Sequence, residues 1–495
     1  MYHFWVRIIM GNVSKLFKKH INYKQWWFKR RSFEKRLYEI LRVKKWKRKA
    51  LTYNPELFSL KDYSLEEIAN TMCKSEVDHW INEIISLSTL LFAIPWGEFW
   101  IFLITAIAAM LFDLLYWNMA FLRLGTGGMI AQAFGRGDNK EIARVYVQGI
   151  STAAVLAALV LAIQYLYVKV AFLFIECTPQ VQELATEYFF IRIWAAPATV
   201  SLYVFKGFFI GMQNTVIPMA VELTINITNI LASIYFALYT PMGFAGIAAG
   251  TVVAQYSGMA LSIVFLLSRY RYLFTDVKIF SCIKLGEMKN FFVLNADLFV
   301  RSLCFLFVYV GFTSLSAKYG DVALAVSSIM MKLMMLFSYF VDGFAYAAEA
   351  LTGRFIGAKD MPSLRKAVKI IFVWSGIIGV VSTFVYLVAA DDMILLMTKD
   401  ANVIEASKKY IGWMLVMPII SCLAFTWDGV YIGATASKAI RNSMLWAVVG
   451  FFAVYYALNA SLGLHALWGA YIIHLLARSA YLTVRAKKDV FSRVG

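Results

Sequence analysis

The chain has few of the residues that build reactive or metal-binding sites. Its 495 residues include only five histidines and five cysteines, and no two cysteines form a C-x-x-C pair. The cysteines are Cys73, Cys177, Cys282, Cys304 and Cys422. This dispersal favours free thiols buried among helices over a disulfide framework or a zinc site. Walker, G-x-S-x-G, H-E-x-x-H and kinase patterns are absent as well. We therefore predict no enzymatic activity, no metal and no cofactor, so any transport must be driven by an ion gradient.

Charge is also scarce. Only 16% of the residues are charged, whereas 61% are hydrophobic, which excludes an ordinary soluble domain. The apolar runs are about 20 residues long, enough to cross a bilayer, and their lack of period-2 alternation favours helices over a barrel. The predicted fold class is an all-α polytopic membrane protein. Eleven spans are predicted, over residues 100–124, 145–175, 186–206, 214–239, 244–268, 289–316, 322–350, 367–390, 409–428, 443–461 and 463–484.

Lysine and arginine gather in every second predicted loop, which indicates that those loops are cytosolic. Parity then requires one more crossing before Trp100 if both termini are cytosolic. Residues 84–96 are the only candidate, and they would bring the total to twelve. The basic loop residues are Arg136, Lys140, Arg144, Lys206, Arg269, Arg271, Lys278, Lys284, Arg354, Lys359, Arg365, Lys366, Lys438, Arg441, Arg485, Lys487 and Lys488.

The net charge of +18 belongs mainly to the start of the chain. Residues 1–49 hold 16 of the 48 basic residues against two acids, so they carry +14 and the remainder carries +4. Tryptophans interleave with this charge, which suits a cytosolic arm lying on anionic lipid headgroups. An RNA-binding arm would have a similar composition, but no stacking or groove-reading motif accompanies this one, so no nucleic-acid partner is predicted. A tail without any partner also fits.

Two distant stretches of the chain are versions of each other. The segment AQAFGRGDNKEIARV from Ala131 aligns with the one ending RFIGAKDMPSLRKAV, so that Gly135 falls on Gly357, an offset of 357 − 135 = 222 residues. At the same offset KGFFIG, ending at Gly211, repeats as DGVYIG, ending at Gly433. A repeat of this length is a duplication within one membrane chain, a symmetry that transporters carry.

Several motifs resemble the multidrug and toxic compound extrusion (MATE) family, and its DinF-like branch in particular. They are FLRLGTGGMIAQAFGRGD from Phe121, KGFFIGMQNTVIPMAVELTINITNIL from Lys206, GFAGIAAGTVVAQY from Gly243, NADLFVRSL from Asn295, DGFAYAAEALTGRFIGAKD from Asp342 and DGVYIGATASKAIRNSML from Asp428. The resemblance covers residues 105–485. It implies twelve helices in two pseudo-symmetric six-helix lobes, a multi-pass protein of the bacterial inner membrane, and export of organic cations or other amphipathic compounds in exchange for H⁺ or Na⁺.

The resemblance also suggests how the chain is divided. We expect a basic, Trp-rich cytosolic extension over residues 1–80, one lobe over 81–270, a cytosolic linker over 271–288 and a second lobe over 289–495. Family members open instead with an apolar first span that bears an acidic residue, and no counterpart is identifiable here. A shifted reading frame or misplaced start is one hypothesis for this abrupt change, and it would leave the chain inactive.

Acidic residues inside the apolar spans are the candidates for ion coupling, because a carboxylate is costly in hydrocarbon and tends to face a cavity or a partner. Asp297 is the first candidate, although Arg301, four residues on, could neutralise it. Asp342 and Glu349 lie seven residues apart and so share one helix face. Asp113 stands alone in its span, where a hydrogen bond to a neighbouring helix is the alternative role.

Amides in the first half offer a second set of candidates. Asn226 and Asn229 share one face of the span 214–239 and could contact substrate or join helices. Glu222 adds a titratable group on that face, and Gln255 and Arg192 are weaker candidates of the same type.

The repeated loops have a mainly structural interpretation. Gly135 and Gly357 allow close helix contact, while Asp138 and Asp360 can cap the helices that follow. Asp428, which aligns with Lys206 in the repeat, is interpreted as a loop salt bridge or a gate residue.

We therefore predict an antiporter whose two lobes alternate access to a central cavity in the bilayer. Within the spans we count Arg192 and Arg301 as the main bases beside four acids, a balance that favours cationic cargo. A flippase of the same superfamily for lipid-linked oligosaccharides, or a non-transporting membrane receptor or scaffold, are the alternatives.

Overall fold

The computed structural model describes residues 112, 115–116, 118–173, 179–275 and 279–494. The predicted basic extension over residues 1–80, the first crossing at 84–96 and Asp113 lie outside the described residues.

Helices account for all of the regular structure in these ranges, which contain no strand, and the predicted all-α polytopic class is confirmed. In the described residues, each predicted span from residue 145 onward falls largely on helix. Nine helical stretches of the described chain are long and apolar enough to cross a membrane, and the predicted span 463–484 is not among them. The α-helices are α6 (Phe121–Arg136), α7 (Asn139–Ala171), α8 (Pro179–Arg192), α9 (Ala196–Gly211), α10 (Val216–Tyr239), α11 (Phe244–Arg269), α12 (Ile279–Cys282), α13 (Leu285–Ala317), α14 (Asp321–Gly357), α15 (Met361–Met397), α16 (Ala401–Lys408), α17 (Ile411–Gly433), α18 (Ser437–Leu462) and α19 (Leu464–Asp489), with 3-10 turns η4 (Asn118–Ala120), η5 (Ile193–Ala195), η6 (Arg271–Phe274) and η7 (Phe491–Val494).

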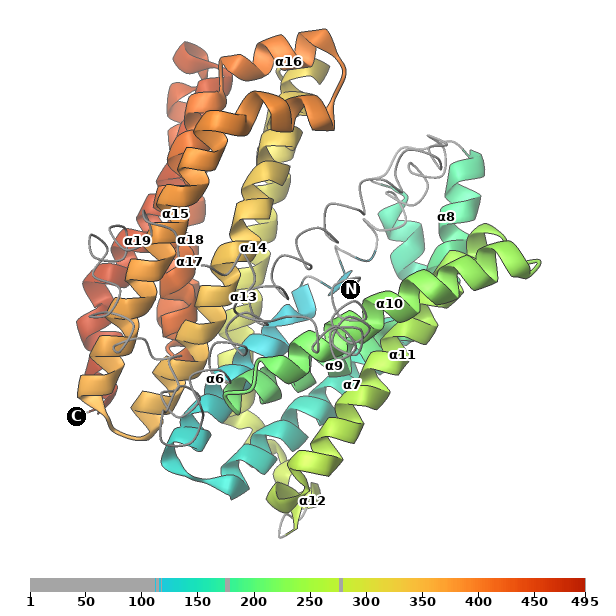
Figure 1. The fold of residues 1–495 in the computed structure, drawn as a ribbon, viewed down its shortest axis with the longest axis vertical. Coiled ribbons are helices and arrows are strands. Elements are labelled where there is room, and N and C mark those ends of the chain that lie inside the picture. Colours follow the sequence, from blue (N-terminus) through green and yellow to red (C-terminus); the bar gives the residue numbers. More distant parts are fainter. Residues whose placement is uncertain (1–111, 113–114, 117, 174–178, 276–278, 495) are drawn as a thin grey trace, which may run out of the picture. The chain divides into compact units, whose positions relative to one another are not determined.

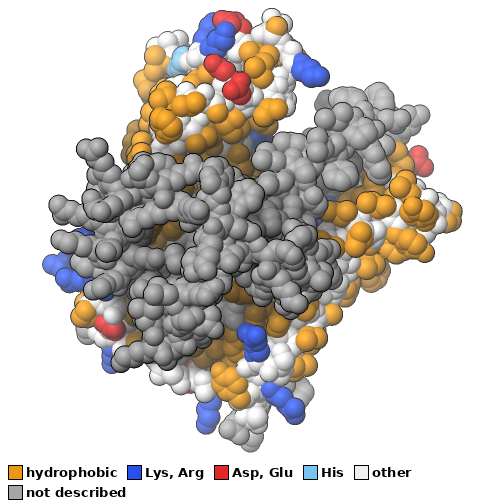
Figure 2. Space-filling model, viewed as in Figure 1, with side chains coloured by type: hydrophobic (Ala, Val, Ile, Leu, Met, Phe, Trp, Pro, Cys, Tyr) orange, Lys and Arg blue, Asp and Glu red, His pale blue; other side chains and the backbone are white. Residues whose placement is uncertain are grey.

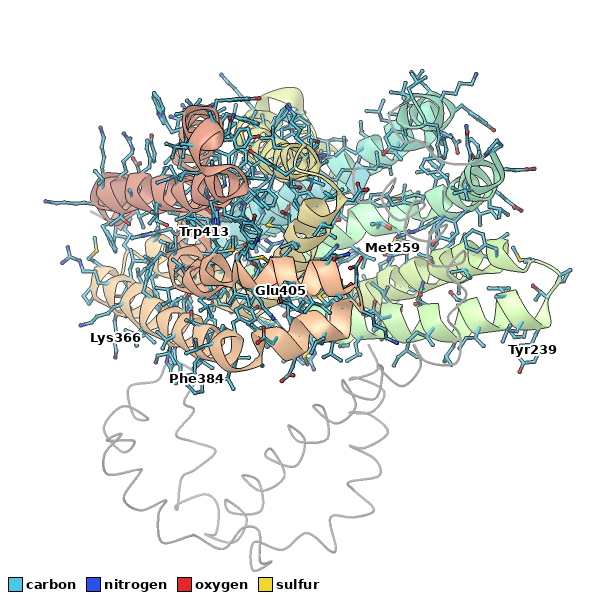
Figure 3. All side chains as sticks on the ribbon, turned by 90° about the horizontal axis from the view of Figure 1, so that it is seen from above. Tyr239, Met259, Lys366, Phe384, Glu405 and Trp413 are labelled. Carbon is cyan, nitrogen blue, oxygen red and sulfur yellow. The ribbon has the colours of Figure 1, made fainter. Side chains whose placement is uncertain are left out.

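Several helices present large apolar side chains outward, as a bilayer requires. On the face drawn in Figure 2, hydrophobic side chains cover long stretches, and charged side chains gather towards the ends. Along α15, Phe384 is 64% exposed and Val388 is 69% exposed. Figure 3 places Phe384 at the outer edge of its helix, with Lys366 nearer the start of the same helix. We interpret this apolar surface as lipid-facing.

Contacts divide the chain into two compact units, which we describe separately. Within the residues that the structure describes, the first unit is drawn from Leu161–Ala198 and Met219–Ser262, and the second from Phe112–Val160, Thr199–Pro218 and Ile263 onward. The lobe boundaries predicted from the sequence stay a prediction.

In the first unit, α10 and α11 pack with almost no space between their backbones. A Cβ atom added at Gly250 would meet the backbone of Ser233, so only glycine fits there. Across the same contact, the Asn229 amide donates to the Thr251 hydroxyl at 2.8 Å. Small residues and interhelical hydrogen bonds are the means by which helices associate in lipid, where the hydrophobic effect between helices is weak.

The second unit contains a bundle of long helices from α13 to α19 (Figure 1), with the short helix α16 at one end. Its core is aromatic. The rings of Phe312 and Trp468 meet edge to face with centroids 4.8 Å apart, and both side chains are almost fully buried. Such pairs pack α13 against α19 and stabilise the bundle through contact rather than through loss of water.

The duplication seen in the sequence is present in the structure of this unit. Gly207 on α9 approaches the carbonyl oxygen of Arg123 on α6 so closely that a Cβ could not fit. Gly429 on α17 approaches the carbonyl of Ala345 on α14 in the same way. Both partners are displaced by 222 residues, since 429 − 207 and 345 − 123 give the same value. The α6–α9 contact therefore repeats as α14–α17.

The two copies also meet each other, α6 against α14, in a reciprocal contact. A Cβ at Gly135 would collide with the carbonyl of Arg354, and a Cβ at Gly357 would collide with the carbonyl of Gln132. These two pairs exchange under the 222-residue offset, so the seam has approximate two-fold symmetry. The close helix contact predicted for both glycines is confirmed.

Candidate functional site

A cavity of about 350 Å³ lies within the second unit, among α13, α14, α17 and α19. Its wall is largely methionine and aromatic. Three polar side chains that can carry charge also line it, namely Arg301, Asp342 and His474. Flexible methionines and flat rings can adapt to apolar ligands of different shape, while the polar groups orient them. The apolar lining includes Phe305, Val308, Tyr309, Met331, Met334, Met335, Tyr339, Phe425 and Tyr471.

Asp342 is the acidic residue that lines this cavity. Asp297, Glu349 and Asp428, by contrast, are each in an ion pair with an arginine. For Asp342 the described part of the chain offers no ion-pair or hydrogen-bond partner, although Arg123 and Arg301 both attract it electrostatically. Its carboxylate is thus available to a ligand or an ion.

Two arginines share a single carboxylate behind the cavity. Arg301 Nη2 and Arg478 Nη2 lie 2.6 and 2.7 Å from Asp428 Oδ2, and both guanidinium groups lie over the Phe305 ring at 4.8 and 4.6 Å. The cluster holds two positive charges against one negative charge. Because Arg478 is fully buried, this pairing compensates a charge that would otherwise be very costly.

The location predicted for Asp428 was wrong. It lies inside α17 and is 4% exposed, not in a loop, because α17 continues to Gly433 beyond the predicted end of the span. The ion pair itself was predicted, but its partners were not. Lys206, its counterpart in the repeat, also lies within a helix, α9, rather than in a loop.

The neutralisation of Asp297 by Arg301 was wrong as well. Asp297 Oδ1 pairs with Arg441 Nη1 at 2.6 Å, and its Oδ2 accepts a hydrogen bond from the Ser437 hydroxyl at 2.7 Å. Arg301 turns instead to Asp428. These contacts tie α13 to the start of α18, so Asp297 holds two helices together.

Glu349 pairs with Arg123 of α6 at 3.2 Å, and the guanidinium group also lies over the Tyr346 ring at 4.4 Å. Asp342 and Glu349 both attract Arg123, which agrees with their predicted common face. In the repeat, Gly127 stands where Glu349 does, and a Cβ there would collide with the Glu349 carboxylate. One copy therefore provides the carboxylate and the other the space for it.

The first-half candidates are not brought into this cavity. Asn229 joins α10 to α11, the structural role among its two predicted ones. Asn226 is exposed, and Glu222 and Gln255 are half-buried. Arg192 lies beside Tyr188, whose hydroxyl accepts a hydrogen bond from it at 3.5 Å.

The two predicted helix caps are confirmed. Asp138 accepts a hydrogen bond from the Glu141 amide, and Asp360 accepts one from the Ser363 amide, both at 3.0 Å.

Sequence reasoning missed the basic half of the site. Arg123 and Arg478 fall inside the predicted spans 100–124 and 463–484, yet only Arg192 and Arg301 were counted there as span bases. Counting every arginine within the predicted spans would have found both. With them included, the acids predicted within the spans no longer outnumber the arginines. Arg441 was predicted only as a basic loop residue and His474 was not predicted at all, since their contacts depend on which helices meet.

Comparison with known proteins identifies this arrangement. A family model described as MatE matches residues 104–234 and 298–458, more than half of the chain. This chain belongs to the MatE family. It is 29% identical to the DNA damage-inducible protein F of Escherichia coli over 377 residues, which cover 76% of this chain and 82% of that protein. It is also 25% identical to the human multidrug and toxin extrusion protein 1 over 349 residues, 70% of this chain and 61% of that protein.

Solved structures of MatE-family transporters share the fold. The outward-facing conformation of a multidrug resistance MATE family transporter superposes with a TM-score of 0.71 at 16% identity, covering 79% of this chain and 89% of that one. A MOP superfamily transporter from Pyrococcus furiosus, with reverse polarity of the binding pocket, superposes with a TM-score of 0.72 at 16% identity, covering 83% of this chain and 93% of that one. By its family, the protein is a polytopic membrane transporter of the MATE type.

A second family model matches before the main body of the MatE region. Residues 24–119 are similar to the family described as glycosyl-4,4'-diaponeurosporenoate acyltransferase. A segment read in a shifted frame is not expected to match a protein family, so this similarity argues against that origin for the basic segment.

Proposed function

We propose that this chain is a secondary antiporter that exports amphipathic compounds, organic cations among them, in exchange for H⁺ or Na⁺. The observation that carries the proposal is Asp342, a carboxylate without an ion-pair partner in the described chain, in the wall of a methionine-rich cavity. Family membership supports export as the task, and the cavity supports the class of compound.

Exchange follows from competition for one carboxylate. A proton, a sodium ion or the positive group of a substrate can each neutralise Asp342, so binding of one favours release of another. The apolar wall accepts the body of the substrate, and rocking of the two homologous halves would expose the cavity to one side at a time. The basic loops support an orientation with both termini cytosolic.

Substitution of Asp342 tests this role. In everted membrane vesicles, Asp342→Asn is expected to reduce gradient-driven transport of a fluorescent organic cation to the background of vesicles without the protein. Asp321→Asn is the matched control, since Asp321 lies exposed in the first turn of the same helix. Transport by Asp342→Asn at the wild-type rate would refute the proposal, and an absence of transport by the wild-type chain would favour a receptor or scaffold.

The coupling ion is identified by imposing a pH gradient or a sodium gradient one at a time. If H⁺ is the coupling ion, collapse of the pH gradient stops transport at constant Na⁺. If Na⁺ is the coupling ion, transport follows the sodium gradient at constant pH.

A flippase for lipid-linked oligosaccharides is a second candidate. Arg301 lines the same cavity, and a guanidinium group would bind a pyrophosphate headgroup. Movement of a fluorescent lipid pyrophosphate across proteoliposomes, with no transport of the cation, would favour this function over drug export.

A further inference from the structure

A second cavity, of about 450 Å³, lies where α17, α18 and the end of α19 meet. It belongs to a predicted cytosolic loop and is separate from the cavity that contains Asp342. Its lining is mostly polar and includes Ser437, Lys438, Arg485, Asp489 and Arg493.

The lining of this cavity is positively charged. Lys438, Arg485 and Arg493 carry three positive charges against the single negative charge of Asp489, which leaves two. The three bases come from three elements, α18, α19 and η7, and they converge only through the fold.

Both arginines of the lining are held in place by hydrogen bonds. Arg485 donates to Asp489 at 2.7 and 3.2 Å, and Arg493 donates to the carbonyl of Ala434 at 2.7 Å. Both guanidinium groups are therefore ordered before any ligand binds, and each has further N–H groups to offer. Lys438 is exposed, and the described chain provides it with no ion-pair partner, so its ammonium group can turn towards a ligand.

The first turn of α18 opens on the same cavity. Its N-cap residue is Ala436, which makes no side-chain cap hydrogen bond, so the amides of Ser437 and Lys438 at the start of the helix remain available as donors. At the equivalent place in the first copy, Asn214 caps α10 by accepting a hydrogen bond from the Ile217 amide at 3.1 Å. These amides add hydrogen-bond donors to a cavity whose net positive charge already favours an anion.

We propose that this cavity binds a phosphate group, supplied either by an anionic lipid headgroup or by a soluble phosphate compound. Guanidinium groups match phosphate oxygens in geometry and in charge, and the excess of two positive charges suits a phosphate better than a neutral ligand. A basic pocket between helices on the cytosolic side is also where anionic lipid headgroups bind.

Binding there would stabilise a contact described above. Ser437 lines the cavity and its hydroxyl donates to Asp297, so the ligand would hold the first turn of α18 against α13. A raised melting temperature is therefore the direct readout of binding. It does not require transport, so this inference and the proposed function can fail independently.

The experiment measures thermal unfolding of the purified full chain in a neutral detergent. One arm adds phosphatidylglycerol, a second adds phosphatidylcholine with the same acyl chains, and a third adds inorganic phosphate against chloride at equal ionic strength. A shift with phosphatidylglycerol alone identifies the lipid as the source, and a shift with inorganic phosphate identifies a soluble compound. Equal shifts with phosphatidylglycerol and phosphatidylcholine, or none in any arm, would overturn the proposal.

Variants locate the site. Lys438→Gln is expected to weaken binding of the effective anion roughly fivefold, the effect of one basic group near an anionic surface, and Lys438→Arg is expected to preserve binding. Lys487→Gln is the matched control, because Lys487 is exposed in the last turn of α19 but does not line the cavity. Equal losses in the two glutamine variants would also overturn the assignment.

Discussion

Asp428 balances the buried guanidinium group of Arg478 and the half-buried one of Arg301 through one oxygen atom, so its substitution should be strongly destabilising. Asp428→Asn would leave Arg301 and Arg478 facing each other without the carboxylate that pairs with both. We expect a loss of about 3 to 5 kcal/mol in the free energy of unfolding, the usual cost of breaking a buried pair from one side. Thermal unfolding of the purified variant in detergent measures it.

Arg478→Met is the matched comparison. It removes one guanidinium but leaves Asp428 paired with Arg301 at 2.6 Å, and the methionine fills much of the space. The expected loss is smaller, about 1 to 3 kcal/mol. A larger loss for Arg478→Met than for Asp428→Asn would contradict this account of the charge balance.

At this scale the acids could be found from the sequence, but their partners could not. A carboxylate within an apolar run is conspicuous, and Asp297, Asp342 and Glu349 were all identified in this way. Pairing depends on which helices meet, and the four-residue spacing of Asp297 and Arg301 was misleading because Asp428 competes for Arg301. The cavity that leaves Asp342 free is likewise a property of several helices.

Among the elements, the contact between α6 and α14 allows a sharp test of packing. Gly357→Ala would place a methyl group against the backbone carbonyl of Gln132, and backbone cannot move aside as a side chain can. We expect a destabilisation of about 1 to 3 kcal/mol, as for other overpacked contacts. Thermal unfolding in detergent again provides the measurement.

The control lies on the same helix. A Cβ at Gly343 would meet nothing within 4 Å, so Gly343→Ala should be neutral or stabilising by about 0.5 to 1 kcal/mol, since alanine favours helix more than glycine does. Equal destabilisation by both substitutions would show that the seam is looser than described.

The cap of α15 predicts a dependence on pH. Hydrogen bonds from Ser363 hold the pKa of Asp360 below its ordinary value, so the charged form is favoured in the folded protein. Its stabilisation is then present above the unfolded pKa of about 3.9 and is lost as the pH falls through the lower folded pKa. The melting temperature of Asp360→Ala should therefore fall below that of the wild type near neutral pH. The difference should shrink as the pH falls through the lowered pKa of Asp360, and a difference that stays constant with pH would contradict the assignment.

Helix positions were predictable because apolar runs are long and continuous, but helix ends were not. The predicted span 322–350 became α14, which runs through 37 residues from Asp321 to Gly357. Hydropathy reports the part inside hydrocarbon, whereas backbone hydrogen bonding carries the helix beyond it. The same difference placed Lys206 and Asp428 in loops when they lie in helices.

For the whole molecule, duplication was the strongest signal in the sequence, and the structure confirms it in detail. The contacts of Gly207 and Gly429 with helix backbones recur at the same offset. Even the left-handed turn after the repeated motif is kept, at Gly137 with φ of 69° and at Lys359 with φ of 55°. The two copies have diverged in charge, since Lys206 aligns with Asp428 and Gly127 with Glu349.

The reciprocal contact made by Gly135 and Gly357 couples the sequence changes that the two halves of the gene can accept. Each glycine faces a backbone carbonyl of the other copy. Neither half can therefore accept a larger residue there without a compensating substitution in the other half. Revertants selected from cells that carry Gly357→Ala should accordingly acquire their second mutation close to Gln132, far away in the coding sequence. Sequencing such revertants would show whether a substitution in one half is compensated by a substitution in the other.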